Sequence, residues 1–287
     1  NQLADERGTK FDRKPYSDYT NYYPSNKHAP MVKSQHPTSK FISLCDCKQI
    51  SRNNWQPLTL FTENGIYKQE MCTPQMAKVK TFALIEPHEF LPPPPPLLGT
   101  NTHDEYIRLF SEVLEWSGKL DDRLKAIHEY WKDGPVDEYP YTSLPSGHFL
   151  GIGVLSAAIR NVPLGETIKL ISAISQAALD SAISAWSCKR FYNSVRPITA
   201  IQCLYKDQIV NAWRGPYLGV GPVNASEWQT YEPNDFITPP FPEYVSGHST
   251  FSASAAEILK RFYNSDRFEF SYTKKAGSSI IEPKRVN

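Results

Sequence analysis

The sequence predicts an all-α fold, a helical bundle preceded by an extended N-terminal arm. Three observations support this prediction. Apolar residues recur at helical spacing between residues 104 and 263, few segments show the alternation typical of strands, and residues 1–40 show no apolar periodicity. With 287 residues and 40% apolar content, the chain can bury a full core.

Composition divides the chain into three parts. Residues 1–40 are rich in Lys, Tyr, Pro, Asn and Ser, which is typical of an arm laid over the surface or onto a neighbouring subunit. Residues 41–100 are irregular and contain the proline run at 92–96, which favours extended polyproline and indicates a wrapping segment. Residues 101–287 carry the helical signals, so we expect them to form the core.

Five helices are predicted in that core, spanning residues 104–116, 121–132, 149–159, 166–195 and 247–263. The first two carry apolar residues at helical spacing that are expected to pack inward: Ile107, Phe110 and Leu114, then Leu124, Ile127 and Trp131. Arg196-Pro197 is expected to interrupt or kink the long helix. The stretch 149–159 is much shorter than the roughly 20 residues that span a bilayer, so we expect a soluble protein with no membrane partner.

The charge balance argues against a nucleic-acid partner. Lys and Arg total 31 against 30 for Asp and Glu, so no global field would attract a polyanion. Any anion site must therefore be local.

Several features favour a secreted, extracellular protein. The chain begins at Asn1 without a leader, as expected of a processed chain. Asn224 begins an Asn-Ala-Ser sequon and is a glycosylation candidate in that setting. Cys45 or Cys47 could bridge to Cys72.

Two short motifs carry the chemistry. Lys189 and Arg196 are seven residues apart, almost two turns of the predicted long helix, so both should project from one face. Ser246-Gly247-His248 stands at the start of the last predicted helix, where free backbone amides favour an anion. Taken singly, the first motif is typical of a solvated face and the second of a helix cap. Together they predict a cage for a tetrahedral oxyanion.

In this order the motifs resemble the signature of the vanadium-dependent haloperoxidases and the related type 2 acid phosphatases. That signature is a lysine, six residues, Arg-Pro and, some tens of residues later, Pro-Ser-Gly-His. The resemblance extends over most of the chain from about residue 50, including residues 54–58, residues 127–131 and Asp180 ahead of Trp186. It implies the helical bundle of that superfamily.

The resemblance also implies a cofactor and its ligands. Vanadate would be the cofactor, and phosphate could occupy the same site. The groups that would hold its oxygens belong to Lys189, Arg196, Ser246 and Gly247. His248 would be the acid/base and Lys189 would take part in catalysis, while Trp186 and Phe241 would line the pocket.

The implied activity is oxidation of a halide by hydrogen peroxide to hypohalous acid, with a small organic molecule as a further partner. Phe241 at the pocket position indicates a chloroperoxidase-like or phosphatase-like lining. Two alternatives stay open. One is an acid phosphatase on the same scaffold, with His248 protonating the leaving alcohol. The other is a secreted structural or binding protein without catalysis.

The sequence departs from the family pattern in two places. Val245 stands where the family usually has Pro, a mild change because Val also holds an extended backbone. The family's Ser-Arg segment, followed by the histidine that bonds vanadium, is absent and would lie beyond residue 287, so no metal ligand is predicted in this chain. We therefore expect a companion C-terminal fragment, cleaved near the dibasic pair Lys284-Arg285, or a homo-oligomer.

Two further residues have open roles. Leu144 to His148 matches the histidine motif literally but precedes the lysine, so it is interpreted as a helix-start cap, the alternative being that His148 lines the pocket entrance. Asp180 could pair with a cation of the pocket, or it could cap a neighbouring helix.

Overall fold

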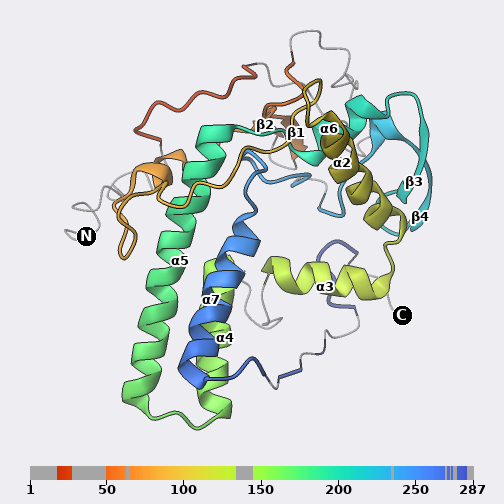
Figure 1. The fold of residues 1–287 in the computed structure, drawn as a ribbon. Helices are drawn as coiled ribbons and strands as arrows, with labels where there is room; N and C mark the ends of the chain where they lie inside the picture. The colour runs from red at the N-terminus through yellow and green to blue at the C-terminus, as the bar shows by residue number, and fades with distance from the viewer. Residues whose placement is uncertain are drawn as a thin grey trace.

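The computed structural model describes residues 18–27, 50–62, 65–133, 145–233, 236–268, 270–271, 273 and 277–282. Within these ranges the regular secondary structure is mainly helical, which confirms the predicted all-α class (Figure 1). The α-helices are α2 His103–Gly118, α3 Asp122–Asp133, α4 Pro145–Ile159, α5 Leu164–Tyr192, α6 Pro197–Leu204 and α7 Gly247–Tyr263. Two short 3-10 helices are η2 Pro74–Lys78 and η3 Ala225–Glu227.

Two antiparallel hairpins accompany the helices. One pairs β1 Thr59–Thr62 with β2 Gly65–Lys68, and the other pairs β3 Ile209–Trp213 with β4 Val220–Asn224. The sequence showed few strand signals, and these strands of four or five residues are too short to produce a clear alternation.

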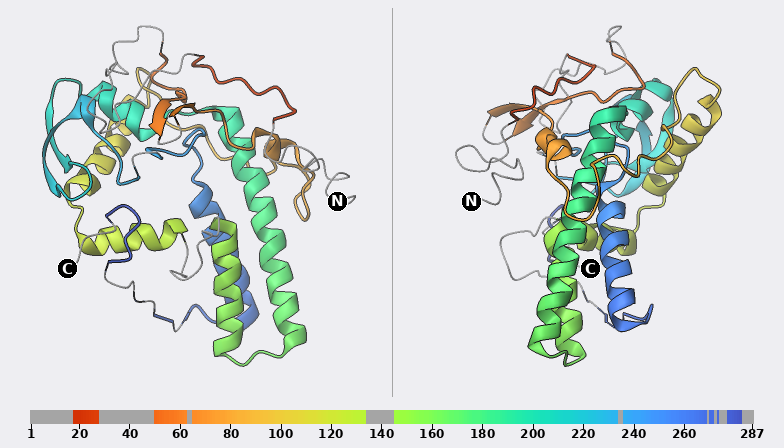
Figure 2. Two further views of the ribbon diagram at one scale, coloured as in Figure 1. Left: turned by 180° about the vertical axis from the view of Figure 1, so that it is seen from behind. Right: turned by 60° about the vertical axis from the view of Figure 1, so that its left-hand side comes forward.

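Helices α4, α5 and α7 lie side by side and form the bundle that supports the candidate site (Figures 1 and 2). Buried apolar residues from all three helices make up one core cluster, among them Phe149, Ile174 and Phe251. Gly153 allows α4 to approach α5 closely, because a Cβ built there would stand 2.6 Å from the Ile174 Cδ1 atom. Helix α3 lies crosswise to α4 and α7.

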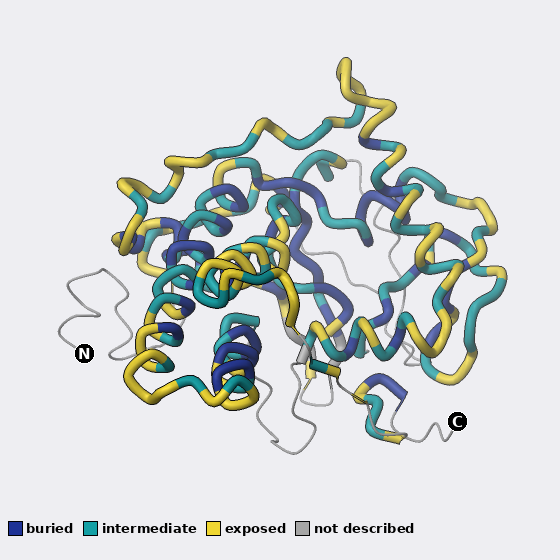
Figure 3. The backbone as a smooth tube through the Cα atoms, turned by 60° about the horizontal axis from the view of Figure 1, so that its bottom comes forward, coloured by how far each residue is buried: buried dark blue, intermediate teal, exposed yellow. Residues whose placement is uncertain are grey.

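A second core cluster joins α2, α6 and the β3–β4 hairpin. Tyr106 and Phe110 of α2 pack there with Ile198 and Ile201 of α6, and Trp228 closes the cluster. Ile107 and Leu114 also pack against it, so the inward face predicted for α2 is confirmed. Figure 3 shows how the buried and exposed positions are distributed along the tube of the chain.

The inward face predicted for α3 is wrong. Ile127 and Trp131 are 41% and 43% exposed, whereas Lys125 and Glu129 of the same helix are 7% and 2% exposed. The reason is a tertiary contact with residues 279–282: the Lys125 ammonium donates to Glu282 at 3.0 Å, and Glu129 accepts from the Ser279 hydroxyl and the Ile280 amide. A paired charge can thus be buried in place of an apolar side chain.

Residues 18–27, the described part of the expected arm, lie against the C-terminal end of α5. The Tyr22 hydroxyl donates to the Asn193 side chain at 2.9 Å, and the Arg190 guanidinium donates to Thr20. The Asn26 amide donates to the carbonyls of Ser51 and Asn54, each at 3.0 Å. The rest of the expected arm lies outside the described residues.

No helix in the described ranges has the length and apolar content needed to cross a bilayer. Cys72 and Cys188 are free thiols. Cys45 and Cys47, the bridge partners suggested for Cys72, lie outside the described residues. The Asn224 side chain caps η3 by accepting from the Ser226 amide at 3.0 Å.

Candidate functional site

Lys189 is a buried lysine in the last turn of α5. Its residue is 1% exposed, and its ammonium donates to the carbonyl oxygens of Pro242 at 2.8 Å and Glu243 at 2.7 Å. Burial and the nearby Arg196 guanidinium lower the pKa of Lys189 to about 7, although the Glu243 carboxylate acts in the opposite direction. A further ammonium proton remains available to a ligand.

Arg196 does not lie on the same helix as Lys189, so the predicted two-turn spacing is wrong. Helix α5 ends at Tyr192, Asn193 takes a left-handed conformation with φ of 48°, and Arg196 is the extended N-cap of α6. Pro197 at the first position of α6 disfavours helical backbone at Arg196, which explains the break.

The two cations nevertheless converge on one aromatic ring. The Lys189 Nζ atom lies 4.7 Å from the Phe241 ring centroid, and the Arg196 Cζ atom lies 5.3 Å from it. The Arg196 guanidinium also donates to the Thr238 hydroxyl at 2.7 Å and to the Phe241 carbonyl at 3.2 Å. Burial lowers the pKa of Arg196 to about 10, so it stays a cation at neutral pH.

The segment before α7 is fastened to the end of α5. The Tyr244 amide donates to the Ser194 hydroxyl at 2.7 Å, and the Glu243 amide donates to the Ser194 carbonyl at 3.2 Å. The Trp186 ring packs on the Phe241 ring with 5.2 Å between centroids. The predicted lining residues therefore form one aromatic wall beside the cations.

The N-terminus of α7 brings the other motif to this wall. Ser246 is the N-cap, and its hydroxyl oxygen accepts from the Ser249 amide at 3.2 Å. A Cβ built on Gly247 would lie 3.6 Å from the Trp186 ring, which places this glycine over the wall. Within the described part of the chain, the backbone amides of Gly247 and His248 donate no hydrogen bond.

His248 is an exposed residue whose imidazole is held by the backbone of Trp131 on α3. Partial burial and the charge of Lys189 lower the pKa of His248 below its ordinary value, and the hydrogen bond to Trp131 opposes that shift. No sequence pattern indicated that α3 would contribute a backbone carbonyl to this histidine.

His148 lies close to this histidine. It is 1% exposed, its ring stacks on the Trp131 ring at 5.4 Å, and its Nε2 atom has no hydrogen-bond partner among the described residues. Burial and the charge of His248 lower the pKa of His148 to about 4, so it is neutral near pH 7. Helix α4 does begin at the predicted motif, at Pro145, but the His148 side chain packs among rings instead of capping the helix.

Asp180 fills neither role considered for it. Its carboxylate accepts hydrogen bonds from the backbone amides of Phe82, Ala83 and Leu84 at 2.6, 2.7 and 3.1 Å. It therefore fastens a distant loop to α5 and pairs with no cation of the cage.

Sequence reasoning missed Thr238, Ser194 and the carbonyls of Pro242 and Glu243. Backbone carbonyls carry no side-chain signal, and hydroxyl residues beside prolines are common in loops. In the described ranges, no group of three or more His, Cys, Asp or Glu residues could hold a metal ion directly. The site can instead bind an anion by charge and hydrogen bonds.

Comparisons with known proteins show what the chain resembles in sequence and fold. Residues 169–286 match the family described as the VCPO second helical-bundle domain. The fold is similar to that of a bacterial vanadium-dependent chloroperoxidase, in its holo form with a TM-score of 0.75 at 22% identity and in its apo form with 0.70 at 23%. Both matches cover 99% of this chain and 58% of the chloroperoxidase chain.

A bacterial vanadium-dependent iodoperoxidase is also similar, with a TM-score of 0.54 and 24% identity over 74% of this chain and 45% of its own. No curated protein matches the sequence. The chain thus spans little more than half the length of the chloroperoxidase that it resembles in fold.

Proposed function

We propose that this chain belongs to the vanadium haloperoxidase-like superfamily, and that it binds vanadate and oxidises halide with hydrogen peroxide. The match of residues 169–286 to the VCPO second helical-bundle domain and the likeness of the fold to a bacterial vanadium-dependent chloroperoxidase support this proposal. One observation carries the proposal. Lys189 and Arg196 are held beside one aromatic ring with carbonyl and hydroxyl oxygens as hydrogen-bond partners, next to the unbonded amides of a helix N-terminus.

The residues fit a tetrahedral oxyanion by charge and by donor chemistry. Two cations with few counter-charges in a low-dielectric interior are stabilised when an anion enters. Lys189 and Arg196 would neutralise vanadate, and the Ser246 hydroxyl proton and the Gly247 amide would donate to its oxygens. When bound, vanadate supplies a centre at which hydrogen peroxide oxidises a halide to hypohalous acid.

Other residues of the chain would shield the cations and transfer protons. The paired rings of Trp186 and Phe241 shield the cations from water, which strengthens their attraction for an anion. His248, which is exposed and has a pKa lowered from its ordinary value, would give and take protons at its imidazole nitrogen. Its hydrogen bond to the Trp131 backbone would fix the ring orientation.

We propose in addition that the histidine that bonds vanadium comes from a companion C-terminal fragment or from another copy of the chain, and that the protein acts outside the cell. Intact-mass analysis and light scattering of the protein purified from its source test the first part. A single 287-residue species that is monomeric would contradict it.

The decisive experiment compares Lys189→Met with Lys169→Met, a matched loss of charge at an exposed position of the same helix. We expect vanadate to raise the melting temperature of the wild type and of Lys169→Met, and to leave that of Lys189→Met unchanged. Absence of a vanadate or phosphate effect on the wild type would refute the cage.

Activity separates the candidate functions. Halogenation of monochlorodimedone with hydrogen peroxide, vanadate and chloride, bromide or iodide supports the haloperoxidase. Hydrolysis of p-nitrophenyl phosphate without halogenation supports the acid phosphatase, which the same cations would serve. Anion binding with neither activity supports a non-catalytic binding protein.

A further inference from the structure

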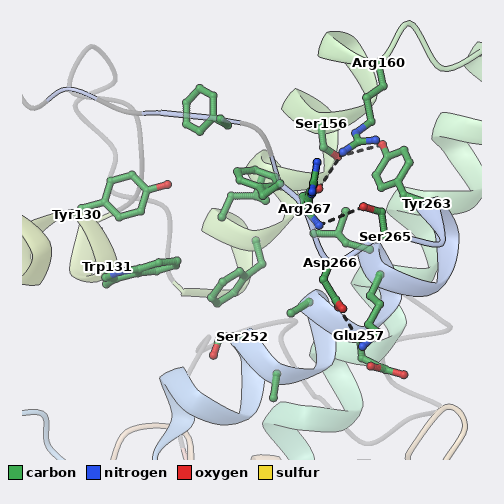
Figure 4. Close-up of a pocket in the computed structure, with 18 of the residues that line it drawn as sticks. Tyr130, Trp131, Ser156, Arg160, Ser252, Glu257, Tyr263, Ser265, Asp266 and Arg267 are labelled. Carbon is green, nitrogen blue, oxygen red and sulfur yellow. Dashed lines mark hydrogen bonds and ion pairs between the residues drawn. The ribbon is translucent and has the colours of Figure 1, made fainter.

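A cavity of about 880 Å³ lies between α3, α4 and α7, and neither Lys189 nor Arg196 lines it (Figure 4). Its volume lies within the range of about 300–1,000 Å³ that small-molecule sites have. None of the roles assigned above uses this space.

The cavity begins one helical turn away from the candidate acid/base. Ser252 lines it and lies four residues after His248, so both side chains lie on one face of α7. Trp131 also lines it, and the backbone of the same residue holds the His248 imidazole. A molecule in the cavity would therefore lie next to the place where His248 acts.

The walls of the cavity are aromatic and its floor is made of small residues. Trp131 and Tyr130 of α3 face Tyr263 of α7 across the space (Figure 4), and the Phe149 ring of α4 lies beside Trp131 with 6.0 Å between centroids. On α7 the floor is formed by small side chains, including Ser252 and Ala256, which leave room for a flat ligand. Trp131 is 43% exposed despite its apolar ring, so it presents stacking surface that the described residues do not cover.

Cationic side chains outnumber acidic ones around the cavity. The lining charges are Arg123, Arg160, Lys260 and Arg267 against Glu257 and Asp266. Both acids are paired, Asp266 with Lys260 at 2.9 Å and Glu257 with Arg261 at 2.6 Å. The Arg160 guanidinium lies 4.5 Å over the Tyr263 ring, which combines a cation with a stacking surface. An anionic group on the ligand would be favoured here.

We propose that this cavity binds a planar aromatic molecule carrying one anionic group. Its use as the organic halogen acceptor rests on the proposed function. In that reaction hypohalous acid attacks an aromatic C–H: the carbon–halogen bond forms as the halogen–oxygen bond breaks, and the displaced proton leaves with the hydroxide as water. The proximity of the cavity to His248 would bring the acceptor to the site where the oxidant is released.

The test uses two dyes that differ in one group. 8-Anilinonaphthalene-1-sulfonate is an aromatic anion, and N-phenyl-1-naphthylamine is the same ring system without the sulfonate. We expect saturable fluorescence enhancement at one sulfonate dye per chain, with weaker binding of the neutral dye. Arg123→Gln and Arg267→Gln should each weaken the sulfonate dye about two- to fivefold and leave the neutral dye unchanged.

A cavity-filling pair of variants locates the site. Ala256→Phe should weaken both dyes at least about tenfold by occupying the floor, whereas Ser172→Phe, at an exposed position of α5, should not. Circular dichroism of both variants checks that they fold. Unchanged dye binding in Ala256→Phe, or equal affinity for the two dyes, would overturn the proposal. So would a co-purifying polypeptide whose removal is required for binding.

Lys189→Met keeps this test separate from the proposed function. It should abolish stabilisation by vanadate and leave dye affinity unchanged. In the wild type, absence of dye binding with vanadate stabilisation intact refutes the cavity assignment alone, and dye binding without vanadate stabilisation refutes the cage alone.

Discussion

Raising the pH from 6 to 9 should weaken oxyanion binding strongly, because the pKa of Lys189 is lowered to about 7. At pH 6 about nine tenths of the Lys189 side chains carry their proton, and at pH 9 about one in a hundred does. If the anion binds only the protonated form, its association constant falls about ninetyfold over this range. Sulfate is the suitable probe since it does not titrate between these values.

The assay is isothermal titration calorimetry with sulfate at constant ionic strength, at four values from pH 6 to 9. Lys189→Arg should bind with little pH dependence, because arginine keeps its proton, and Lys169→Met should behave as the wild type. A wild-type change below about threefold, or the same slope in Lys189→Met, would refute the role given to this lysine.

The stability of the unliganded protein should change in the opposite direction. The Lys189 pKa is lower in the folded protein than the ordinary lysine value of 10.5. Between about pH 7 and 10.5 the unfolded chain therefore binds more protons at this side chain, so the free energy of unfolding rises with pH. Comparing urea unfolding of the wild type and Lys189→Met across this range isolates the contribution.

Three further predictions concern the scaffold. Asp180→Asn should lower the free energy of unfolding by about 2–4 kcal/mol, since an amide nitrogen would face a backbone donor; a loss below about 1 kcal/mol in urea unfolding contradicts this. Lys125→Met should lower the free energy of unfolding by about 3–5 kcal/mol, because the buried Glu282 carboxylate would lose its cation, and the double variant with Glu282→Leu should recover much of that loss in thermal melts. The free energy of unfolding should fall between about pH 6.5 and 4, because the unfolded chain protonates His148 while the folded protein keeps it neutral. His148→Phe should make this fall smaller. An unchanged dependence of the free energy of unfolding on pH would count against this role.

Local signals predicted some elements of this fold closely. The bounds of α7 follow from Ser246 as N-cap and from Asn264, whose left-handed conformation ends the helix. The predicted end of α5, residue 195, lies three residues beyond the observed end at Tyr192. Asn193 is held there by Tyr22 and Ser25, more than 160 residues earlier in the chain, and no local pattern reports such a contact.

The side chains of the candidate cage could be predicted from the sequence, but the backbone path and the hydrogen-bond partners that position them could not. Lys189 and Arg196 do meet, although a helix end and a turn bring them together in place of a continuous helix. The partners that position them are mostly main-chain oxygens, which any sequence would supply. Only the fold decides which of these oxygens lie within reach.

The contact between Asp180 and the loop at residues 82–84 requires a specific side chain on one of its two sides only. On the helix side it needs one particular carboxylate. On the loop side it uses only main-chain N–H groups, and Phe82 and Ala83 are exposed. The loop can therefore exchange these side chains freely, apart from proline, and keep its position. New surface chemistry could be introduced there without disturbing the helix that carries Lys189.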